Sequence, residues 1–210
     1  MPYSIVAVGT SWGGLSAMRQ LLGALPRGFP IPIIVVQHRA KDSDLLLSQL
    51  LQDSTDLKVC EIEDKDVLQP GRVHVAPADY HVMLELGFAS LTVEGPVRFS
   101  RPSIDVTFDS VADTYGPAAI AVVLTGANED GARGLAQIAR RGGRALVQDP
   151  KTAEIPIMPQ AAIRAVPSAE VVPLDMLAPR LIELSREQSE PRLIEASRDD
   201  SKPRLERRPA

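Results

Sequence analysis

The sequence predicts an α/β domain with a doubly wound, mostly parallel sheet between two helical layers, a Rossmann-like three-layer arrangement. Short apolar runs rich in β-branched residues alternate with segments of helical periodicity up to about residue 184. The runs are almost continuously apolar, which is typical of strands that are buried on both faces. Strands that alternate with helices along the chain favour a parallel sheet. With 210 residues, the chain is long enough for one such domain with a sizeable core.

The expected elements follow one another in a regular order. Strands of the main sheet are expected at residues 4–9, 31–37, 57–62, 72–77, 119–124 and 144–149. Helices are expected at residues 15–25, 43–52, 103–115, 131–141, 159–165 and 174–184. The segments HVMLEL and SLTVEG flank Gly87, and this pattern predicts a small β-hairpin inserted into the domain.

Residues 185–210 differ in composition from the rest of the chain. The motif Pro-Arg-Leu-Ile-Glu begins at residue 179 and again at residue 191, and a degenerate copy begins at residue 203, a spacing of 12 residues. The segment carries 7 basic and 6 acidic side chains and few apolar ones, so it lacks the apolar surface that folding requires. We therefore expect a folded domain over residues 1–184 and a disordered charged tail over residues 185–210. The alternative is a tail that binds a partner.

Composition and charge argue against several classes of protein. The net charge is −4 and the isoelectric point is near 5.4, so no overall basic field favours nucleic acid as a partner. The N-terminal segment resembles neither a signal peptide nor a membrane span. The single cysteine, Cys60, excludes an internal disulfide and fits a reducing cytoplasm, where we expect this protein. Three histidines without a second cysteine argue against zinc, and we expect neither a metal nor a cofactor.

A glycine-rich turn, VAVGTSWGGLSAM at residues 6–18, follows the first expected strand and has two interpretations. A dinucleotide-binding turn requires the spacing G-x-G-x-x-G and an acidic residue that ends the second strand. Here the glycines are Gly9, Gly13 and Gly14, and the second strand ends in Gln37 and His38. The lysine of a phosphate-binding loop is also missing from the turn. The sequence therefore disfavours nucleotide binding.

The same turn matches G-x-S-x-G, the pattern that exposes a nucleophilic serine between a strand and a helix. The serine is Ser11, and a serine needs a neighbouring base to attack an ester. His38 ends the second strand, and LTGANEDG at residues 124–131 offers Glu129 and Asp130 after a later strand. The carboxyl ends of parallel strands form one crevice, so these side chains are expected to meet there. Asp130 has an alternative role as the N-cap of the following helix.

These motifs, in this order, resemble the catalytic domain of the CheB-type chemotaxis receptor methylesterases. The resemblance extends over most of residues 4–184. It rests on GTSWGG (9–14), VVQH (35–38), GRVHVAPADYHV (71–82), RPSIDVTFDSVA (101–112), LTGANEDGARGL (124–135) and IMPQAAI (157–163). Position by position, the family's catalytic serine, histidine and aspartate fall on Ser11, His38 and Asp130.

The resemblance implies a serine hydrolase that removes methyl groups from glutamate γ-methyl esters and releases methanol. It also implies deamidation of some glutamines. The expected partners are methylated chemoreceptor-type proteins, at their cytoplasmic helical region, and no oligomeric state is implied. Because the sequence begins at the first catalytic strand, we expect no receiver domain and no control by phosphorylation in cis. The alternative function is a non-catalytic signalling module with the same fold.

Further residues around the expected cleft are candidates for the oxyanion hole or the cleft wall. Trp12 stands where the family often has a small residue or threonine, and Ala127 and Asn128 replace a common Met-Gly pair. Backbone N–H groups near Trp12 and Ala127 are candidates for an oxyanion hole. His81 and Arg101 are candidates for the cleft wall, with a structural role as the alternative. Two further residues, Cys60 and His74, are expected to be structural parts of strands.

Overall fold

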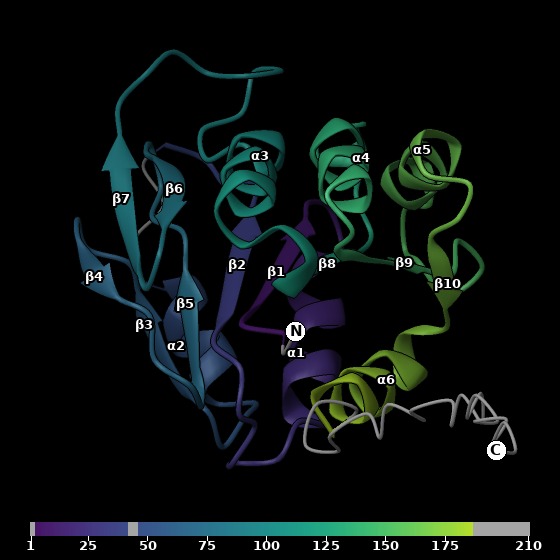
Figure 1. The fold of residues 1–210 in the computed structure, drawn as a ribbon, viewed down its shortest axis with the longest axis horizontal. Coiled ribbons are helices and arrows are strands. Elements are labelled where there is room, and N and C mark those ends of the chain that lie inside the picture. The colour runs from purple at the N-terminus through teal and green to yellow at the C-terminus, as the bar shows by residue number, and fades with distance from the viewer. Residues whose placement is uncertain (1–2, 42–45, 187–210) are drawn as a thin grey trace, which may run out of the picture.

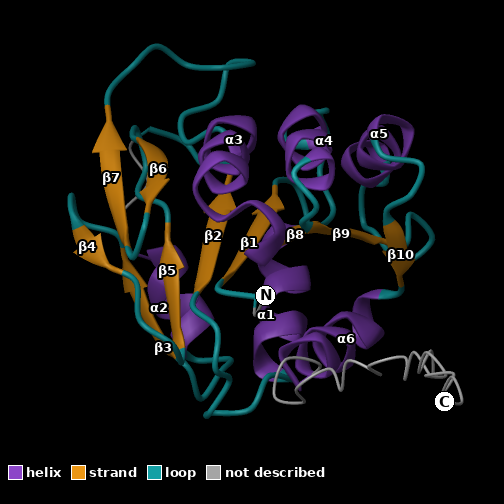
Figure 2. Ribbon diagram, in the orientation of Figure 1, coloured by secondary structure: helices purple, strands orange, loops and turns teal. Residues whose placement is uncertain are grey.

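The computed structural model describes residues 3–41 and 46–186, and these residues form three layers. A central sheet lies between two layers of helices, as Figures 1 and 2 show. Helices α3 (Ile104–Tyr115), α4 (Ala132–Arg140) and α5 (Ile157–Ala165) cover one face. Helices α1 (Gly14–Gly23), α2 (Leu46–Gln52) and α6 (Leu174–Arg186) cover the other. The expected doubly wound α/β architecture is confirmed.

The central sheet has seven strands, and every adjacent pair is parallel. In sequence order the strands are β1 (Ile5–Thr10), β2 (Ile33–Gln37), β3 (Lys58–Glu61), β5 (Arg72–Val75), β8 (Ala119–Val123), β9 (Arg144–Gln148) and β10 (Glu170–Val172). Their spatial order is β10-β9-β8-β1-β2-β5-β3. The chain winds from β1 toward β3 and then returns to β8 on the other side of β1. This topological switch point is where ligands bind in open α/β sheets.

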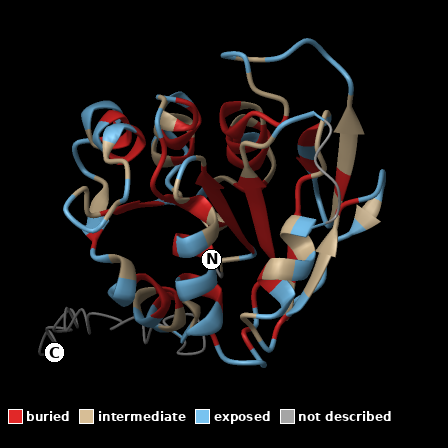
Figure 3. Ribbon diagram, turned by 180° about the vertical axis from the view of Figure 1, so that it is seen from behind, coloured by how far each residue is buried: buried red, intermediate tan, exposed pale blue. Residues whose placement is uncertain are grey.

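Side chains of the central strand alternate between the two hydrophobic cores. Ile5 and Ala7 of β1 face the core under α3, α4 and α5. Val6 and Val8 face the core that α1, α2 and α6 cover. All four are buried, and Figure 3 shows the middle of the sheet buried from end to end. Burial on both faces explains why these strands are continuously apolar in the sequence.

A second, antiparallel sheet is inserted between β5 and α3. It contains β4 (Asp66–Val67), β6 (His81–Glu85) and β7 (Phe88–Thr92), in the order β4-β7-β6. The strands β6 and β7 form the predicted hairpin, and Gly87 turns between them with a φ of 88°. The insertion is anchored on α3, since the Oγ of Ser110 accepts a hydrogen bond from Leu84 N and the Oγ1 of Thr107 donates one to Val82 O.

Three features differ from the sequence prediction. The strands β4 and β10 were not predicted, because two or three residues carry no periodicity and form a strand only through pairing. Helix α6 continues to Arg186, two residues past the predicted domain boundary at 184. The remainder of the predicted tail, with the later copies of the 12-residue repeat, lies outside the described residues. Within residues 3–41 and 46–186, no helix is long and apolar enough to cross a membrane.

Candidate active site

Ser11 lies in the turn between β1 and α1, at the topological switch point. Its N–H donates to Thr125 O (3.0 Å), and its carbonyl oxygen accepts from Gln37 Nε2 (2.8 Å) and from Gly14 N (3.0 Å). Thr10, the preceding residue, is buried and donates its hydroxyl to Thr125 O. The backbone of Ser11 is therefore tied to the ends of both neighbouring strands. Its side chain lies at the protein surface, in a partly exposed position.

Two glycines allow this turn to form. Gly13 has a φ of 78°, a conformation that costs a residue with a side chain 1 kcal/mol or more, roughly. A Cβ atom on Gly126, in the loop after β8, would lie 3.0 Å from Ser11 Cβ and 2.7 Å from the end of Met158. A side chain at position 126 would therefore push this loop away from Ser11. Of the glycines that predicted a nucleophile turn, Gly13 is thus required by the geometry, and Gly126 was not part of that prediction.

His38 follows β2 and is oriented by Asp130. The Nε2 atom of His38 lies 2.7 Å from Asp130 Oδ2. The Asp130 side chain is fully buried, whereas the His38 side chain keeps 11% of its surface exposed. The His38 N–H donates to Thr10 O, which fixes the start of the loop next to Ser11. Two members of the predicted Ser-His-Asp set, far apart in the sequence, are therefore in direct contact.

The Asp130 carboxylate lies at the N-terminus of α3. It receives hydrogen bonds from His38 Nε2 (2.7 Å), Ser103 Oγ (3.0 Å), Ile104 N (2.7 Å), Asp105 N (3.1 Å) and Gly131 N (3.1 Å). Burial by itself raises the pKa of Asp130. The His38 hydrogen bond and charge, with the N–H groups of Ile104 and Asp105, outweigh it, so the pKa lies below its ordinary value. Asp130 is therefore ionised at neutral pH, and His38 Nε2 carries the proton between them.

Asp130 does cap a helix, but the helix is α3 and not α4, for which the sequence had offered Asp130 as the N-cap. Helix α4, which follows Asp130, has Gly131 at its N-cap and no side-chain cap on that residue. Asp105 of α3 supplies the missing acceptor, because its Oδ1 accepts from Gly131 N (3.0 Å) and Gly134 N (2.8 Å). Asp130 in turn binds the N-terminus of α3. Each helix N-terminus is thus bound by a carboxylate from the other segment, and these reciprocal hydrogen bonds hold Asp130 in contact with His38.

Ser11 and His38 line the same surface cleft of about 500 Å³. The other lining residues are Trp12, Gly13, Gly14, Leu15, Ser16, Gln37 and Glu154. The indole Nε1 of Trp12 donates to Glu154 Oε1 (3.1 Å), and Trp12 keeps 66% of its surface exposed. Trp12 and Glu154 thus form one wall of the cleft, next to the serine.

An oxyanion hole requires backbone N–H groups that are free to donate, and those of Trp12 and Ala127 meet this requirement. Within the described part of the chain, neither group donates a hydrogen bond. The neighbouring Gly126 N donates to Ile155 O, which holds the Ala127 loop close to the Ser11 turn. Ala127 is exposed, so its N–H group is not shut away in the core.

His81 and Arg101 are not among the residues that line this cleft. His81 is buried, and its Nδ1 accepts from Ser103 N (3.1 Å) while its Nε2 lies 3.2 Å from Gly95 O. The Ser103 hydroxyl then donates to Asp130, so His81 reaches the site through Ser103 alone. Arg101 forms an ion pair with Asp79 and donates to the carbonyl oxygens of Val93 and Glu94, in the loop directly after β7. The contacts of both side chains favour the structural role that was the alternative.

Three residues to which the sequence analysis assigned no role contribute to the site. Gln37 clamps the Ser11 carbonyl, Ser103 donates to Asp130, and Asn128 Nδ2 lies 3.3 Å from His38 Nδ1. The signal for Gln37 was a polar residue at the end of a buried apolar strand. Ser103 could have been found as the N-cap of its helix. Asn128 stood out only as part of the pair that replaces Met-Gly, and its contact with His38 depends on how two distant loops meet.

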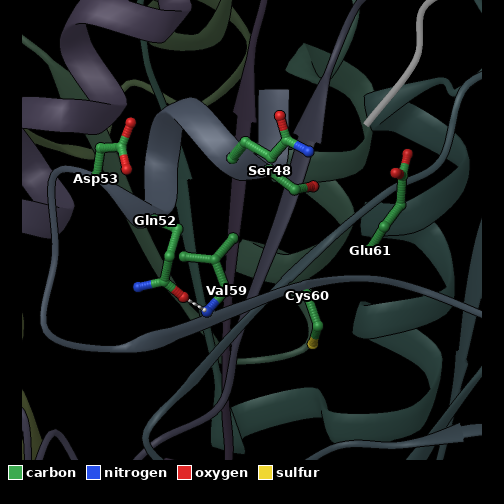
Figure 4. Close-up of a pocket in the computed structure, with 7 residues that line it drawn as sticks. Ser48, Gln52, Asp53, Val59, Cys60 and Glu61 are labelled. Carbon is green, nitrogen blue, oxygen red and sulfur yellow. Dashed lines mark hydrogen bonds between the residues drawn. The ribbon is translucent and has the colours of Figure 1, made fainter. Parts of the chain in front are cut away.

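A second cleft, shown in Figure 4, lies between α2 and β3 and measures about 350 Å³. Cys60 lines it, and the Sγ atom of Cys60 lies 3.5 Å from His74 Nδ1. The sequence did not pair Cys60 with a histidine, but Cys60 and His74 stand opposite each other on β3 and β5. Burial raises the pKa of the Cys60 thiol and lowers the pKa of His74. Both groups are therefore neutral at pH 7, as expected for structural residues.

Comparisons with known proteins agree on one family. The family model described as CheB methylesterase matches residues 6–181. A Leptospira interrogans protein, provisionally named a protein-glutamate methylesterase/protein-glutamine glutaminase, is 42% identical over 191 residues, which cover 90% of this chain and 99% of that protein. The Myxococcus xanthus protein-glutamate methylesterase FrzG is 37% identical over 183 residues, which cover 87% of this chain and 55% of FrzG.

A solved structure leads to the same family. The crystal structure of the Thermotoga maritima CheB methylesterase catalytic domain superposes with a TM-score of 0.83 at 32% sequence identity. The match covers 88% of this chain and 100% of the Thermotoga chain. Sequence and fold agree over the region that holds Ser11, His38 and Asp130, and the chain belongs to the CheB methylesterase family.

Proposed function

We propose that this protein hydrolyses glutamate γ-methyl esters in chemoreceptor-type signalling proteins, with Ser11 as nucleophile, His38 as base and Asp130 as the group that orients the base. The observation that carries the proposal is the contact between His38 Nε2 and the buried Asp130 carboxylate, in a cleft that Ser11 also lines. The relatives' names include both protein-glutamate methylesterase and protein-glutamine glutaminase. Glutamine deamidation would use the same groups.

In the first step, Ser11 Oγ attacks the ester carbonyl while His38 Nδ1 takes the hydroxyl proton. Nδ1 is the nitrogen available for this task, because Nε2 is engaged with Asp130. The carbonyl oxygen becomes negatively charged, and the N–H groups of Trp12 and Ala127 would stabilise it, each by roughly 3 kcal/mol. The tetrahedral intermediate collapses, the methoxy group takes the proton from His38, and methanol leaves. The glutamyl group is then esterified to Ser11.

In the second step, water replaces methanol. His38 Nδ1 takes a proton from water, the hydroxide attacks the acyl-serine, and the proton returns to Ser11 as the glutamate carboxyl group is released. With a glutamine substrate, ammonia leaves in place of methanol. The ionised state of Asp130 supports both steps, because a carboxylate beside Nε2 stabilises the charged imidazole that each step creates.

The position of the cleft suits a large substrate. The cleft opens at the carboxyl edge of the sheet, and its wall includes the exposed indole of Trp12. An extended side chain that projects from a helical protein could reach Ser11 without unfolding of either partner. Methylated protein glutamates are the substrate class that family membership implies. We infer that the specific substrates are the cytoplasmic helical regions of chemoreceptor-type proteins.

Release of methanol from a methylated chemoreceptor tests this function. We expect the wild-type protein to release methanol, and we expect Ser11→Ala to reduce the rate by about 10⁴-fold or more. The control is Ser16→Ala, since Ser16 also lines the cleft but lies on α1. Equal release by wild type and Ser11→Ala would rule out Ser11 as the nucleophile. Receptor binding without release of methanol by the wild type would favour a non-catalytic signalling module.

A further inference from the structure

The side chain of Asn128 makes a contact that the proposed reaction does not use. Asn128 lies in the loop between β8 and α4, and it is partly buried. Its Nδ2 atom is 3.3 Å from His38 Nδ1, the nitrogen assigned above as the base. An amide nitrogen can only donate hydrogen bonds, so His38 Nδ1 must be the acceptor in this contact.

The amide of Asn128 is oriented by its other end. Asn128 Oδ1 accepts a hydrogen bond from Asp130 N at 3.0 Å. A backbone N–H can only donate, so the oxygen must face Asp130 and the nitrogen must face His38. His38 therefore has no proton on Nδ1, and its proton lies on Nε2, 2.7 Å from Asp130 Oδ2. Asn128 and Asp130 together select the tautomer that a base needs.

Asn128 also competes with Ser11 for the base. An unprotonated ring nitrogen has a single lone pair, which can accept a hydrogen bond from Asn128 or a proton from Ser11, but not from both. Ser11 and His38 line the same cleft, yet among the described residues no hydrogen bond involves Ser11 Oγ. The base is bonded to Asn128 instead.

We propose that Asn128 is a positioning residue that selects the Nε2–H tautomer of His38 and occupies Nδ1 until Ser11 displaces it. The inference rests on the proposed function in that Ser11 and His38 act as nucleophile and base. The displacement requires Asn128 Nδ2 to leave His38 Nδ1. The competing interaction is a single neutral hydrogen bond, so it limits the reactivity of Ser11 without abolishing it.

Two substitutions separate the two roles of Asn128. In Asn128→Ser, the hydroxyl can still accept from the Asp130 N–H, as serine does in short polar turns, but it is too short to reach His38. In Asn128→Asp, a carboxylate of the same shape faces Nδ1. A carboxylate can only accept, so it attracts a proton to Nδ1 and leaves His38 charged between two carboxylates with no lone pair.

The rate at which a fluorophosphonate reacts with Ser11 measures the reactivity of the serine, and this small reagent needs no receptor. We expect Asn128→Ser to react about two- to tenfold faster than wild type, the range that one neutral hydrogen bond provides. We expect Asn128→Asp to react slower by on the order of 10² or more, because a protonated base cannot take the serine proton. The imidazole ¹⁵N resonances of His38 should show an unprotonated Nδ1 in wild type and two protonated nitrogens in Asn128→Asp.

Circular dichroism and the thermal midpoint establish that each variant is folded. A folded Asn128→Ser protein that reacts at or below the wild-type rate would overturn the competition, and a proton on Nδ1 in wild type would overturn the tautomer assignment. Absence of labelling in every variant would count against both proposals. If labelling responds as expected but methylated receptor yields no methanol, the proposed substrate is wrong and the role of Asn128 stands.

Discussion

Two regions of this fold place a nucleophilic side chain near a histidine, and the two histidines differ in which ring nitrogen can accept a proton. Ser11 and His38 share the cleft at the carboxyl edge of the sheet. Cys60 and His74 lie 3.5 Å apart on the paired strands β3 and β5. By intrinsic nucleophilicity, the thiol pair is the stronger candidate. The difference lies in what the other nitrogen of each histidine binds.

In the cysteine pair, the histidine presents the wrong nitrogen. His74 Nε2 accepts a hydrogen bond from Gln69 N (3.2 Å), so the proton of the neutral ring lies on Nδ1 and points toward Cys60. The thiol therefore faces a donor and cannot give up its own proton there. In the serine pair, Asp130 accepts a hydrogen bond from His38 Nε2–H, so the lone pair is on Nδ1, which faces Asn128. The second partner of the histidine decides whether it can act as a base.

The charges around the two pairs also favour the serine pair: they stabilise a charged histidine at His38 and oppose a thiolate at Cys60. Asp130 is kept ionised by five donors, so it can stabilise a charged His38 during the reaction. Near Cys60, burial and then the negative charge of Asp66 oppose formation of a thiolate, and the pKa of the thiol is raised. Proximity of a nucleophile and a histidine is therefore not enough to identify an active site.

The comparison is tested most strongly by the matched substitutions His38→Gln and His74→Gln. In both, the glutamine amide can keep the outer contact of the ring, to Asp130 or to Gln69 N, but it is not a base. We expect His38→Gln to reduce methanol release by on the order of 10⁴-fold or more. We expect His74→Gln to remain within about twofold of wild type, since it lies outside the cleft.

The outcome is measured with methylated receptor, after each variant has been shown to fold by circular dichroism. A comparable loss of activity in both variants would mean that the two histidines are coupled through the sheet, and that the contrast between the pairs is wrong.

A smaller effect is expected in the dependence of stability on pH. Burial lowers the pKa of His74, so the folded protein binds a proton there less readily than the unfolded chain does. The stability that neutral His74 confers is present above the ordinary histidine pKa of about 6.5 and is lost as the pH falls through the lower pKa of the folded state. His74→Gln should remove this part of the acid destabilisation.

Urea unfolding midpoints between about pH 7 and pH 5 measure the effect, because this interval lies at and below the ordinary histidine pKa. Asp130 contributes a separate loss at lower pH, since its pKa lies below the ordinary aspartate value and its stabilisation fades only as the pH falls through that range. An unchanged pH dependence in His74→Gln would contradict the assignment of a buried neutral imidazole.

The smallest effect concerns Cys60. Thiol reagents attack the thiolate, and the raised pKa of Cys60 reduces the thiolate fraction at neutral pH. We expect iodoacetamide to modify Cys60 more slowly in the folded protein than in the same protein unfolded in urea. Cys60→Ser should keep the rate of methanol release within about twofold of wild type. Rapid modification that also stops methanol release would reassign Cys60 to the reaction.

Much of the fold could be predicted because its signals are local. Continuous apolar runs located six strands of the main sheet, and helical periodicity located the helices around it. Strand β10 was not predicted, because only three residues form it and it is a strand only through its pairing with β9. In the same way, β4 exists only through its pairing with β7. Short strands depend on partners that no local pattern reveals.

The site likewise combines residues that have local sequence signals with contacts that depend on packing. Ser11 and His38 carry local signals, a glycine-rich turn and a polar end to an apolar strand. The contact of Asp130 with the N-terminus of α3, and the reciprocal contact of Asp105 with α4, have no local signal, because the two helices are brought together only by packing. His81 had two interpretations in the sequence, a place in the cleft wall or a structural role. Its burial and its contacts with Ser103 and Gly95 favour the structural role.

The sequence by itself determined the class of fold, the serine turn and the placement of Ser11, His38 and Asp130 at the carboxyl edge, because these follow from periodicity, glycine placement and the parallel sheet. Only the tertiary structure decided which nitrogen of each histidine is free to accept a proton. That property depends on single hydrogen bonds, from Asn128 and Asp130 of a distant loop at His38 and from the nearby Gln69 at His74. A hydrogen bond requires atoms to meet within a few tenths of an ångström, and such precision arises only when the whole chain has packed.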